Sequence, residues 1–286
     1  MNKDAEKLIN IAVEEMISKI SDKEKIKFIL DKHISKIHFV PLSYRVFGGL
    51  LQSLNIQYGN FIEVLMSVLI ENEKNENNIA RYKINKQLSG KRSNKFEISK
   101  SVEQMIDEYI SHCQTDYKIN ELKQNFSNLL ESIANNKDRD VATFKHDIDL
   151  LFEDVNTGIN YYVEIKYNDD HDTGKFVDIN RKLIKTYAYL FNTLKLSNKN
   201  QLVPILFYFN NKKKKTNPFI PEPSNLKRGQ TFFDDFLSVS YDDIFDLLKR
   251  LGLSQDVNDK FDGLYQKVLS YVKEYDTSSV KIDDDN

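Results

Sequence analysis

The segments Lys145–Glu153 (KHDIDLLFE) and Tyr161–Lys166 (YYVEIK), with Thr157-Gly158 between them, decide the fold of this chain. Both segments are rich in β-branched and aromatic residues, which favour strands. The tripeptide Asn156-Thr157-Gly158 has the composition of a turn. We therefore expect two adjacent antiparallel strands.

The register of this pair decides which side chains share a face. We centre the turn on Thr157-Gly158, so that Asp149 lies opposite Lys166 and, in the same register, Leu151 lies opposite Glu164. Because side chains alternate between the two faces of a strand, Asp149, Glu164 and Lys166 then project from one face. A register that differs by one residue separates Asp149 from the other two. The opposite, apolar face is expected to hold Ile148, Leu150, Phe152, Val163 and Ile165.

Two carboxylates and one ammonium on one face favour metal-dependent phosphodiester chemistry. Facing residues lie roughly 5 Å apart, so one small cation can be shared between them. Oxygen ligands suit a hard divalent ion, and Mg²⁺ keeps several waters and binds substrate phosphates. The ion polarises the phosphate and lowers the pKa of a bound water, while the lysine orients that water or offsets negative charge. The alternative interpretation is a solvated hairpin face with ordinary charges.

Asp149 followed by Glu164-Ile165-Lys166 on the next strand resembles the PD-(D/E)XK nuclease superfamily, and the whole chain resembles a type II restriction endonuclease. The resemblance implies that Asp149 and Glu164 are metal ligands and that Lys166 is the catalytic lysine. The proline of the motif is absent, because Ile148 precedes Asp149. Many members of the superfamily also lack it.

The order of expected elements is similar to the αβββαβ core of this superfamily. A helix over 119–135, a short strand over 141–144, the strand pair, a helix over 177–192 and a buried strand over 202–209 follow one another. The resemblance therefore implies an α/β fold of the restriction-endonuclease type. Its mixed central sheet is flanked by extensive N- and C-terminal helices.

Three regions follow one another along the chain. Residues 1–78 form a region of amphipathic helices, residues 79–210 form the catalytic core, and residues 211–286 form a loop and a C-terminal helical layer packed on the core. Restriction enzymes of this superfamily often take a further metal ligand from an N-terminal helix, and Glu63 is similar to that usage. The alternative is a solvent-facing glutamate. Glu121 and Glu131 are the next candidates.

The composition indicates the cellular compartment but does not decide whether the protein binds nucleic acid. The 286 residues carry 41 basic and 43 acidic side chains, a net charge of −2, which neither indicates nor excludes nucleic acid. Cys113 is the single cysteine, so no intrachain disulfide forms and a reducing cytoplasm is expected. No stretch has the length of a membrane span, and the first residues do not read as a signal peptide.

Basic residues gather in three places where DNA phosphates or base edges can be contacted. Residues 90–95 are expected to form a basic turn, which is not a phosphate-binding P-loop because Arg92 replaces the required Ser or Thr. The helix over 177–192 has a basic flank, and four lysines follow Asn211. Residues 90–95 can equally be a solvated loop, and the four lysines can also be a solubilising turn, although their position after the core strand favours DNA. The candidate DNA contacts are Lys91, Arg92, Lys95, Arg181, Lys182, Lys185, Lys212 and Lys213.

These observations predict a Mg²⁺-dependent type II restriction endonuclease that cuts double-stranded DNA at a short specific site. Two-fold symmetric sites match two-fold symmetric proteins, so we expect a homodimer, paired functionally with a DNA methyltransferase. One alternative is a structure-specific or repair nuclease. The other is a DNA-binding module without catalysis.

Overall fold

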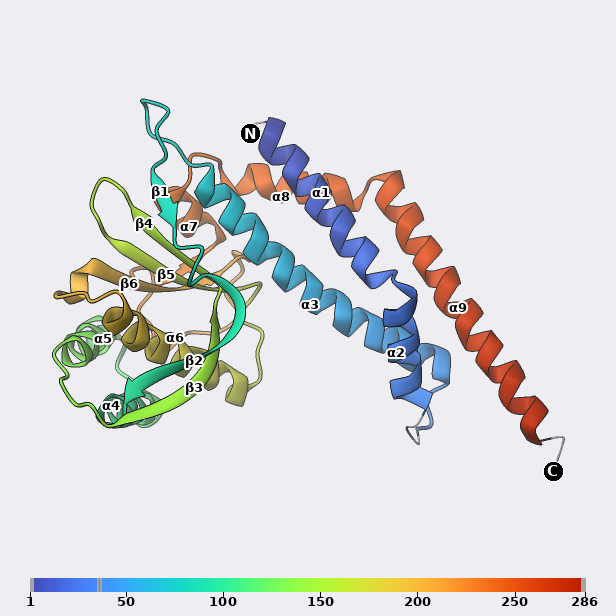
Figure 1. The fold of residues 1–286 in the computed structure, drawn as a ribbon, viewed down its shortest axis with the longest axis horizontal. Coiled ribbons are helices and arrows are strands. Elements are labelled where there is room, and N and C mark those ends of the chain that lie inside the picture. The colour runs from blue at the N-terminus through green and yellow to red at the C-terminus, as the bar shows by residue number, and fades with distance from the viewer. Residues whose placement is uncertain (1–2, 35, 37, 284–286) are drawn as a thin grey trace. The chain divides into compact units, whose positions relative to one another are not determined.

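The computed structural model describes residues 3–34, 36 and 38–283, and it separates into two compact units (Figure 1). The first unit combines residues up to 61 with residues from 242 onward, and the second contains Ile62–Tyr241. These units are defined by contacts in space. The three consecutive regions expected from the sequence are not tested by them and stay a prediction.

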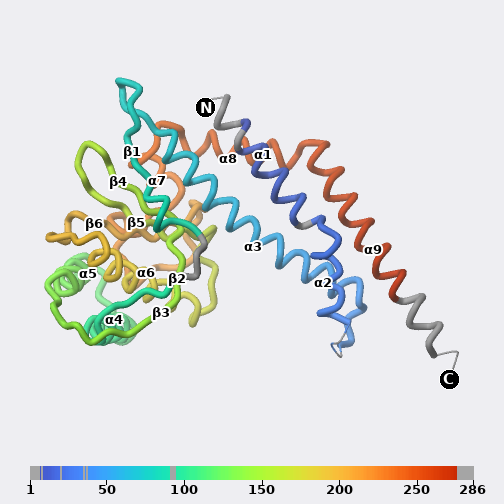
Figure 2. The backbone as a smooth tube through the Cα atoms, in the orientation of Figure 1, coloured from blue at the N-terminus to red at the C-terminus, as the bar shows by residue number. Residues whose placement is uncertain are grey.

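The first unit is helical. It contains α1 (Lys3–Ile20), α2 (Lys23–Ile34), the first part of α3 (Leu42–Glu71), most of α8 (Tyr241–Gly252) and α9 (Gln255–Asp283). The N-terminal helices and α9 come together although they are distant in sequence, as Figure 2 shows in blue and red. None of the described helices is long and apolar enough to cross a membrane. The core of the first unit is formed by Ile26, Ile29, Leu30, Val46, Leu50, Leu264, Val268 and Val272.

The second unit is built on a mixed sheet with the strand order β1-β4-β5-β6-β7. Pairing is antiparallel from β1 to β5 and parallel from β5 to β7. The order α5, β3, β4, β5, α6, β6 confirms the expected αβββαβ core. The strands are β1 (Tyr82–Ile84), β4 (Leu150–Asp154), β5 (Asn160–Lys166), β6 (Leu202–Tyr208) and β7 (Leu226–Arg228).

Helices cover both faces of this sheet. On one face, α4 (Lys100–Thr115), α5 (Ile119–Ala134) and α6 (Thr173–Thr193) share a core with Leu151, Tyr162 and Leu206. On the other face, α7 (Gly229–Phe236) packs its aromatic rings against Phe152 and Phe207. A strand that is covered on both faces loses the polar alternation of a half-exposed strand. The alternative interpretation of a solvated hairpin face therefore does not hold for β5, whose residues Tyr162 to Ile165 are buried.

Residues 90–95 were expected to form a turn, and this prediction is wrong. They begin β2 (Gly90–Ser99), which pairs antiparallel with β3 (Val141–Ile148) in a separate two-stranded ribbon. The second half of β2 alternates between exposed and buried residues, and Phe96 and Ile98 enter the helical core. The polar first half hides this alternation, and the partner strand is far away in the sequence. The expected strand over 141–144 is correspondingly longer.

The β4–β5 turn is centred one residue earlier than expected. Leu151 faces Tyr162 rather than Glu164, so the register prediction is wrong by two residues. The Asp154 carboxylate accepts hydrogen bonds from the N–H groups of Asn156 and Thr157 at 2.9 and 3.2 Å, which fixes the turn. Because the shift is even, the faces are preserved. Continued by one residue, the observed register places Asp149 opposite Glu164.

We expect Gly229→Ala to destabilise the protein. An added Cβ would meet the ring of Tyr241 and lie 2.7 Å from the carbonyl oxygen of Phe209. Overpacking of this kind lowers the free energy of unfolding by about 1–3 kcal/mol, which urea denaturation measures. Gly263→Ala is the matched control, because nothing lies within 4 Å of its Cβ position in α9. It should raise the stability by about 0.5–1 kcal/mol; an equal effect of both changes would contradict this packing.

Candidate active site

The structure brings the three expected catalytic residues together. Asp149 lies between β3 and β4, and Glu164 and Lys166 lie near the end of β5. The Lys166 Nζ is 2.7 Å from Glu164 Oε1 and 3.3 Å from Asp149 Oδ2. It also donates to the carbonyl oxygen of Ile165 at 2.8 Å. Three oxygens of different residues therefore converge on one positive charge.

The two carboxylates are almost entirely removed from solvent. The side chains of Asp149 and Glu164 are 9% and 3% exposed, against 24% for Lys166. Burial and the neighbouring Glu164 raise the pKa of Asp149 to about 7, and Lys166 opposes this shift. Burial also disfavours the charged form of Glu164, but Lys166 and His146 hold the pKa of Glu164 below its ordinary value. Glu164 is therefore the ionised member of the pair.

Lys166 is held as an ammonium. Burial alone would lower its pKa, but the adjacent Glu164 and Asp149 carboxylates raise the pKa of Lys166 above its ordinary value. A lysine in this state donates hydrogen bonds and supplies positive charge. In this arrangement it cannot accept a proton, so its chemistry is electrostatic.

Glu63 acts on the same site from the second half of α3. Its charge contributes to raising the pKa values of both Asp149 and Lys166. The other helix candidates lie elsewhere: Glu131 on α5 pairs with Lys199 at 2.9 Å, and Glu121 lies 3.9 Å from Lys118. Within the described residues, no three Asp, Glu, His or Cys side chains are gathered closely enough to form a metal centre by themselves.

Two residues that the sequence analysis did not select also touch this site. His146 Nε2 lies 3.0 Å from Glu164 Oε2, and the Tyr162 hydroxyl donates to the same oxygen at 2.8 Å. Both residues stand within the segments that decide the fold. Tyr162 is two positions before Glu164, which puts it on the same face of β5, and this spacing was the available signal.

The expected basic flank of α6 is engaged in ion pairs. Arg181 Nε lies 2.8 Å from Asp107 Oδ1, and Lys185 pairs with Glu103, so these two cations join α6 to α4. Lys182 pairs with Asp178 within α6 at 2.8 Å. Their proposed role in DNA binding stays a prediction.

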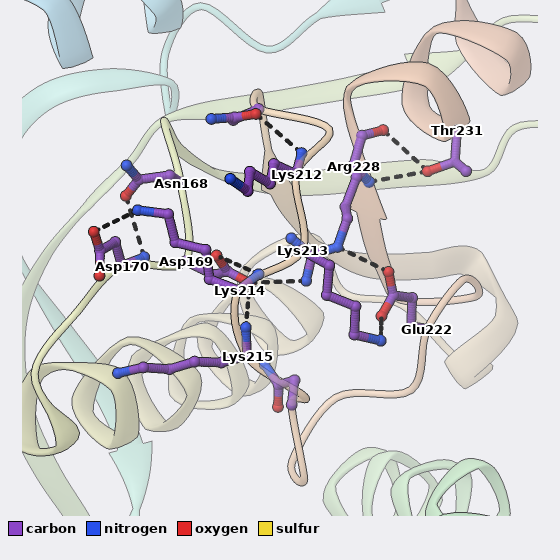
Figure 3. A network of polar contacts seen from close by, with 12 residues as sticks. Asn168, Asp169, Asp170, Lys212, Lys213, Lys214, Lys215, Glu222, Arg228 and Thr231 are labelled. Carbon is purple, nitrogen blue, oxygen red and sulfur yellow. Dashed lines mark hydrogen bonds and ion pairs between the residues drawn. The ribbon is translucent and has the colours of Figure 1, made fainter.

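The four-lysine loop is anchored by its backbone (Figure 3). Asp169, 1% exposed, accepts from the N–H groups of Lys214 and Lys215 at 3.0 Å and from Arg228 Nη2 at 3.0 Å. Glu222 pairs with Arg228 Nε at 3.0 Å and with Lys213 Nζ at 2.7 Å. Asp169 and Glu222 therefore hold the loop in place. This buried network could not be predicted from the sequence, because Asp169, Lys214 and Arg228 are distant along the chain.

The β2–β3 ribbon carries two lysines directly opposite each other. Lys95 on β2 and Lys145 on β3 are cross-strand partners, and both are exposed. Neither forms an ion pair with any residue that the structure describes. Like charges that face each other across a strand pair repel. The side chains of Lys91 and Arg92, two other candidates on β2, lie outside the described part of the chain.

Comparison with known proteins identifies the family. The sequence model of the type II restriction endonuclease HinfI family matches residues 1–252. The chain belongs to this family. It is 47% identical over 270 residues to the type II restriction enzyme HinfI of Haemophilus influenzae, a match that covers 94% of this chain and 99% of that protein. No solved structure matches the chain.

Membership of the HinfI family confirms the enzyme class expected from the sequence. Type II restriction endonucleases are site-specific deoxyribonucleases, and this chain is one of them. The repair nuclease and the DNA-binding module without catalysis are thereby set aside.

We expect Asp169→Asn to destabilise this HinfI-family enzyme in a pH-dependent way. Burial opposes ionisation, but the N–H groups of Lys215 and Lys214 and the charge of Arg228 hold the pKa of Asp169 below its ordinary value. Removing one member of a buried pair costs about 3–5 kcal/mol. A carboxylate with a lowered pKa adds stability above its unfolded pKa of about 3.9, and that stability is lost as the pH falls through the lower folded value.

The measurement is urea denaturation of both proteins between pH 7 and pH 3. The difference in the free energy of unfolding should be constant at neutral pH and shrink in acid. Asp170→Asn is the control, because Asp170 pairs with Lys214 at the exposed surface and should matter much less. A difference that does not change with pH would show that Asp169 is not held as a carboxylate.

Proposed function

We propose that this enzyme hydrolyses phosphodiester bonds of double-stranded DNA with Mg²⁺ bound by Asp149 and Glu164, and that Glu63 completes the site. The observation that carries this proposal is the convergence of buried carboxylate oxygens beside one ammonium. The charges of Glu164 and Glu63 both act on Asp149, and the charge of Lys166 opposes them.

The donor set fits a hard divalent cation. Its oxygens come from carboxylates and from the Ile165 carbonyl, which now binds Lys166. All-oxygen sites suit Mg²⁺ better than metals that prefer nitrogen or sulfur. Burial, followed by the charges of Glu164 and Glu63, raises the pKa of Asp149. A cation bound beside Asp149 would favour its ionised form.

The bound ion would polarise the scissile phosphate and lower the pKa of a water molecule. The protein contributes orientation and charge. The Ile165 N–H donates to Asp149 Oδ2 at 2.8 Å and so fixes that carboxylate. The Lys166 ammonium can donate to a phosphate oxygen or to the attacking water, where it offsets the negative charge that develops during hydrolysis. Lys166 is therefore the proposed catalytic residue, and Asp149 and Glu164 are the proposed ligands.

The β2–β3 ribbon is the best-supported DNA contact. The exposed Lys95 and Lys145 repel each other in the free protein, and a phosphate placed between them would remove that repulsion. Lys212 on the exposed loop is a second contact, and Lys91, Arg92 and Lys213 remain candidates. Arg181, Lys182 and Lys185 already have acidic partners, so we expect smaller contributions from them.

We further propose that the enzyme is a homodimer, is paired with a DNA methyltransferase and acts in the cytoplasm. A homodimer would place two identical sites on the two strands of a symmetric recognition sequence. A paired DNA methyltransferase would protect the host's copies of that sequence, and both proteins would act in the cytoplasm. The single cysteine is compatible with a reducing compartment.

The test is incubation of the purified enzyme with unmethylated phage DNA in Mg²⁺ or in EDTA, followed by electrophoresis. We expect discrete bands in Mg²⁺ and intact DNA in EDTA. Lys166→Ala should abolish cleavage and leave DNA binding in a gel-shift assay unchanged, because its charge acts on the reaction. Cleavage by Lys166→Ala at the wild-type rate would overturn the assignment of the site.

We expect Glu63→Gln to weaken Mg²⁺ binding while the fold is retained. The change keeps the size of the side chain and removes one negative charge that acts on Asp149. Titration calorimetry measures the Mg²⁺ affinity, and Glu131→Gln is the control because that residue pairs with Lys199. Equal Mg²⁺ affinities of the two variants would exclude Glu63 from the site.

A further inference from the structure

We propose that Tyr162 and His146 are positioning residues that fix the Glu164 carboxylate, so that Glu164 Oε1 alone is presented to the catalytic cation. This inference rests on the proposed function, because it concerns the same site. The juxtaposition that carries it is the double contact on Glu164 Oε2, at 2.8 Å from Tyr162 and 3.0 Å from His146.

The two oxygens of Glu164 have different surroundings. Oε2 receives the Tyr162 hydroxyl and lies beside His146 Nε2, whereas Oε1 lies 2.7 Å from Lys166 Nζ. An ionised carboxylate only accepts hydrogen bonds, so His146 must carry a proton on Nε2 to bind it. One oxygen is therefore held by two donors of the scaffold. The other oxygen, Oε1, faces Lys166 Nζ, which also lies 3.3 Å from Asp149 Oδ2.

The environment makes this contact rigid. Tyr162 is fully buried in β5, and His146 stands on β3 with a side chain that is 14% exposed. The Tyr162 hydroxyl donates to Glu164 Oε2 from this buried position. Two strands of different sheets thus hold one carboxylate oxygen. A carboxylate that is restrained in this way cannot rotate to offer both oxygens to a cation.

Partners of this kind act on metal affinity. Groups that hydrogen-bond to a ligand orient it, and their removal typically costs 10–100-fold in metal affinity or activity. We therefore extend the functional pattern of this enzyme to His146-x-x-Asp149 and Tyr162-x-Glu164-x-Lys166. Both added residues contact Glu164, His146 from β3 and Tyr162 from β5.

The experiment compares Tyr162→Phe, His146→Ala and His146→Gln with the wild-type enzyme. Titration calorimetry with Mg²⁺ and cleavage rates over a range of Mg²⁺ concentrations are measured for each variant. Tyr162→Phe and His146→Ala should bind Mg²⁺ about 10–100-fold more weakly. High Mg²⁺ should restore most of their cleavage rate. The amide of His146→Gln can still donate, so this variant should recover much of the affinity.

Tyr161→Phe is the matched control. It removes a hydroxyl from the neighbouring position of the same strand, whose ring packs against Phe152 and Phe236 on the opposite face of the sheet. Its Mg²⁺ affinity should equal that of the wild type. Thermal unfolding without metal identifies any variant that fails to fold, and the two positions are tested separately so that one misfolded variant leaves the other as a test.

Two results distinguish this inference from the proposed function. If Asp149→Asn loses Mg²⁺ binding but Tyr162→Phe and His146→Ala keep the wild-type affinity, the positioning role is wrong and the metal site stands. If Asp149→Asn itself binds Mg²⁺ normally, the metal site is wrong. A double variant with Glu164→Gln gives a further check. There, Tyr162→Phe should have no additional effect on Mg²⁺ affinity, because the two residues act as one unit; full additivity would overturn the proposal.

Discussion

The burial of Asp149 and Glu164 beside the single ammonium of Lys166 is the constraint on which the surrounding structure depends. A charge without partners is expensive to remove from water, so each buried carboxylate needs donors. The Ile165 N–H, the Tyr162 hydroxyl and His146 supply them. These donors come from β3 and β5, which belong to different sheets. The site therefore requires the ribbon and the central sheet to be joined at this point.

The basic side chains of this enzyme include buried or paired ones that stabilise the fold and exposed ones on the ribbon. Arg181, Lys185 and Arg228 are paired with acidic residues and hold helices or loops together. Lys95 and Lys145 face solvent on the ribbon. Since exposed phosphate contacts are screened by salt and buried pairs much less, ionic strength should separate DNA binding from folding. A net charge near zero is thus compatible with a local surface that attracts DNA.

Much of the core was predictable because its signals are local. The pattern Asp149, Glu164, Lys166 and the element order could be read from alternation and spacing, and an even shift in register left the shared face intact. The features that could not be predicted depend on residues that are distant in sequence. The β2 strand needs β3 to be recognised, and Asp169 needs Arg228, 59 positions away in sequence. Helices cover both faces of the sheet, which alternation along a single strand does not reveal.

The helical unit is discontinuous, since it joins residues up to 61 with residues from 242 onward. During translation, the whole of Ile62–Tyr241 is synthesised before α9 begins. Chains fold as units while they are synthesised, at about 5–20 residues per second. At this rate, the segment from Asp242 to the end of α9 at Asp283 takes about 2–8 seconds to add. The order of synthesis thus completes β3, β4 and β5 before the last helix of the helical unit.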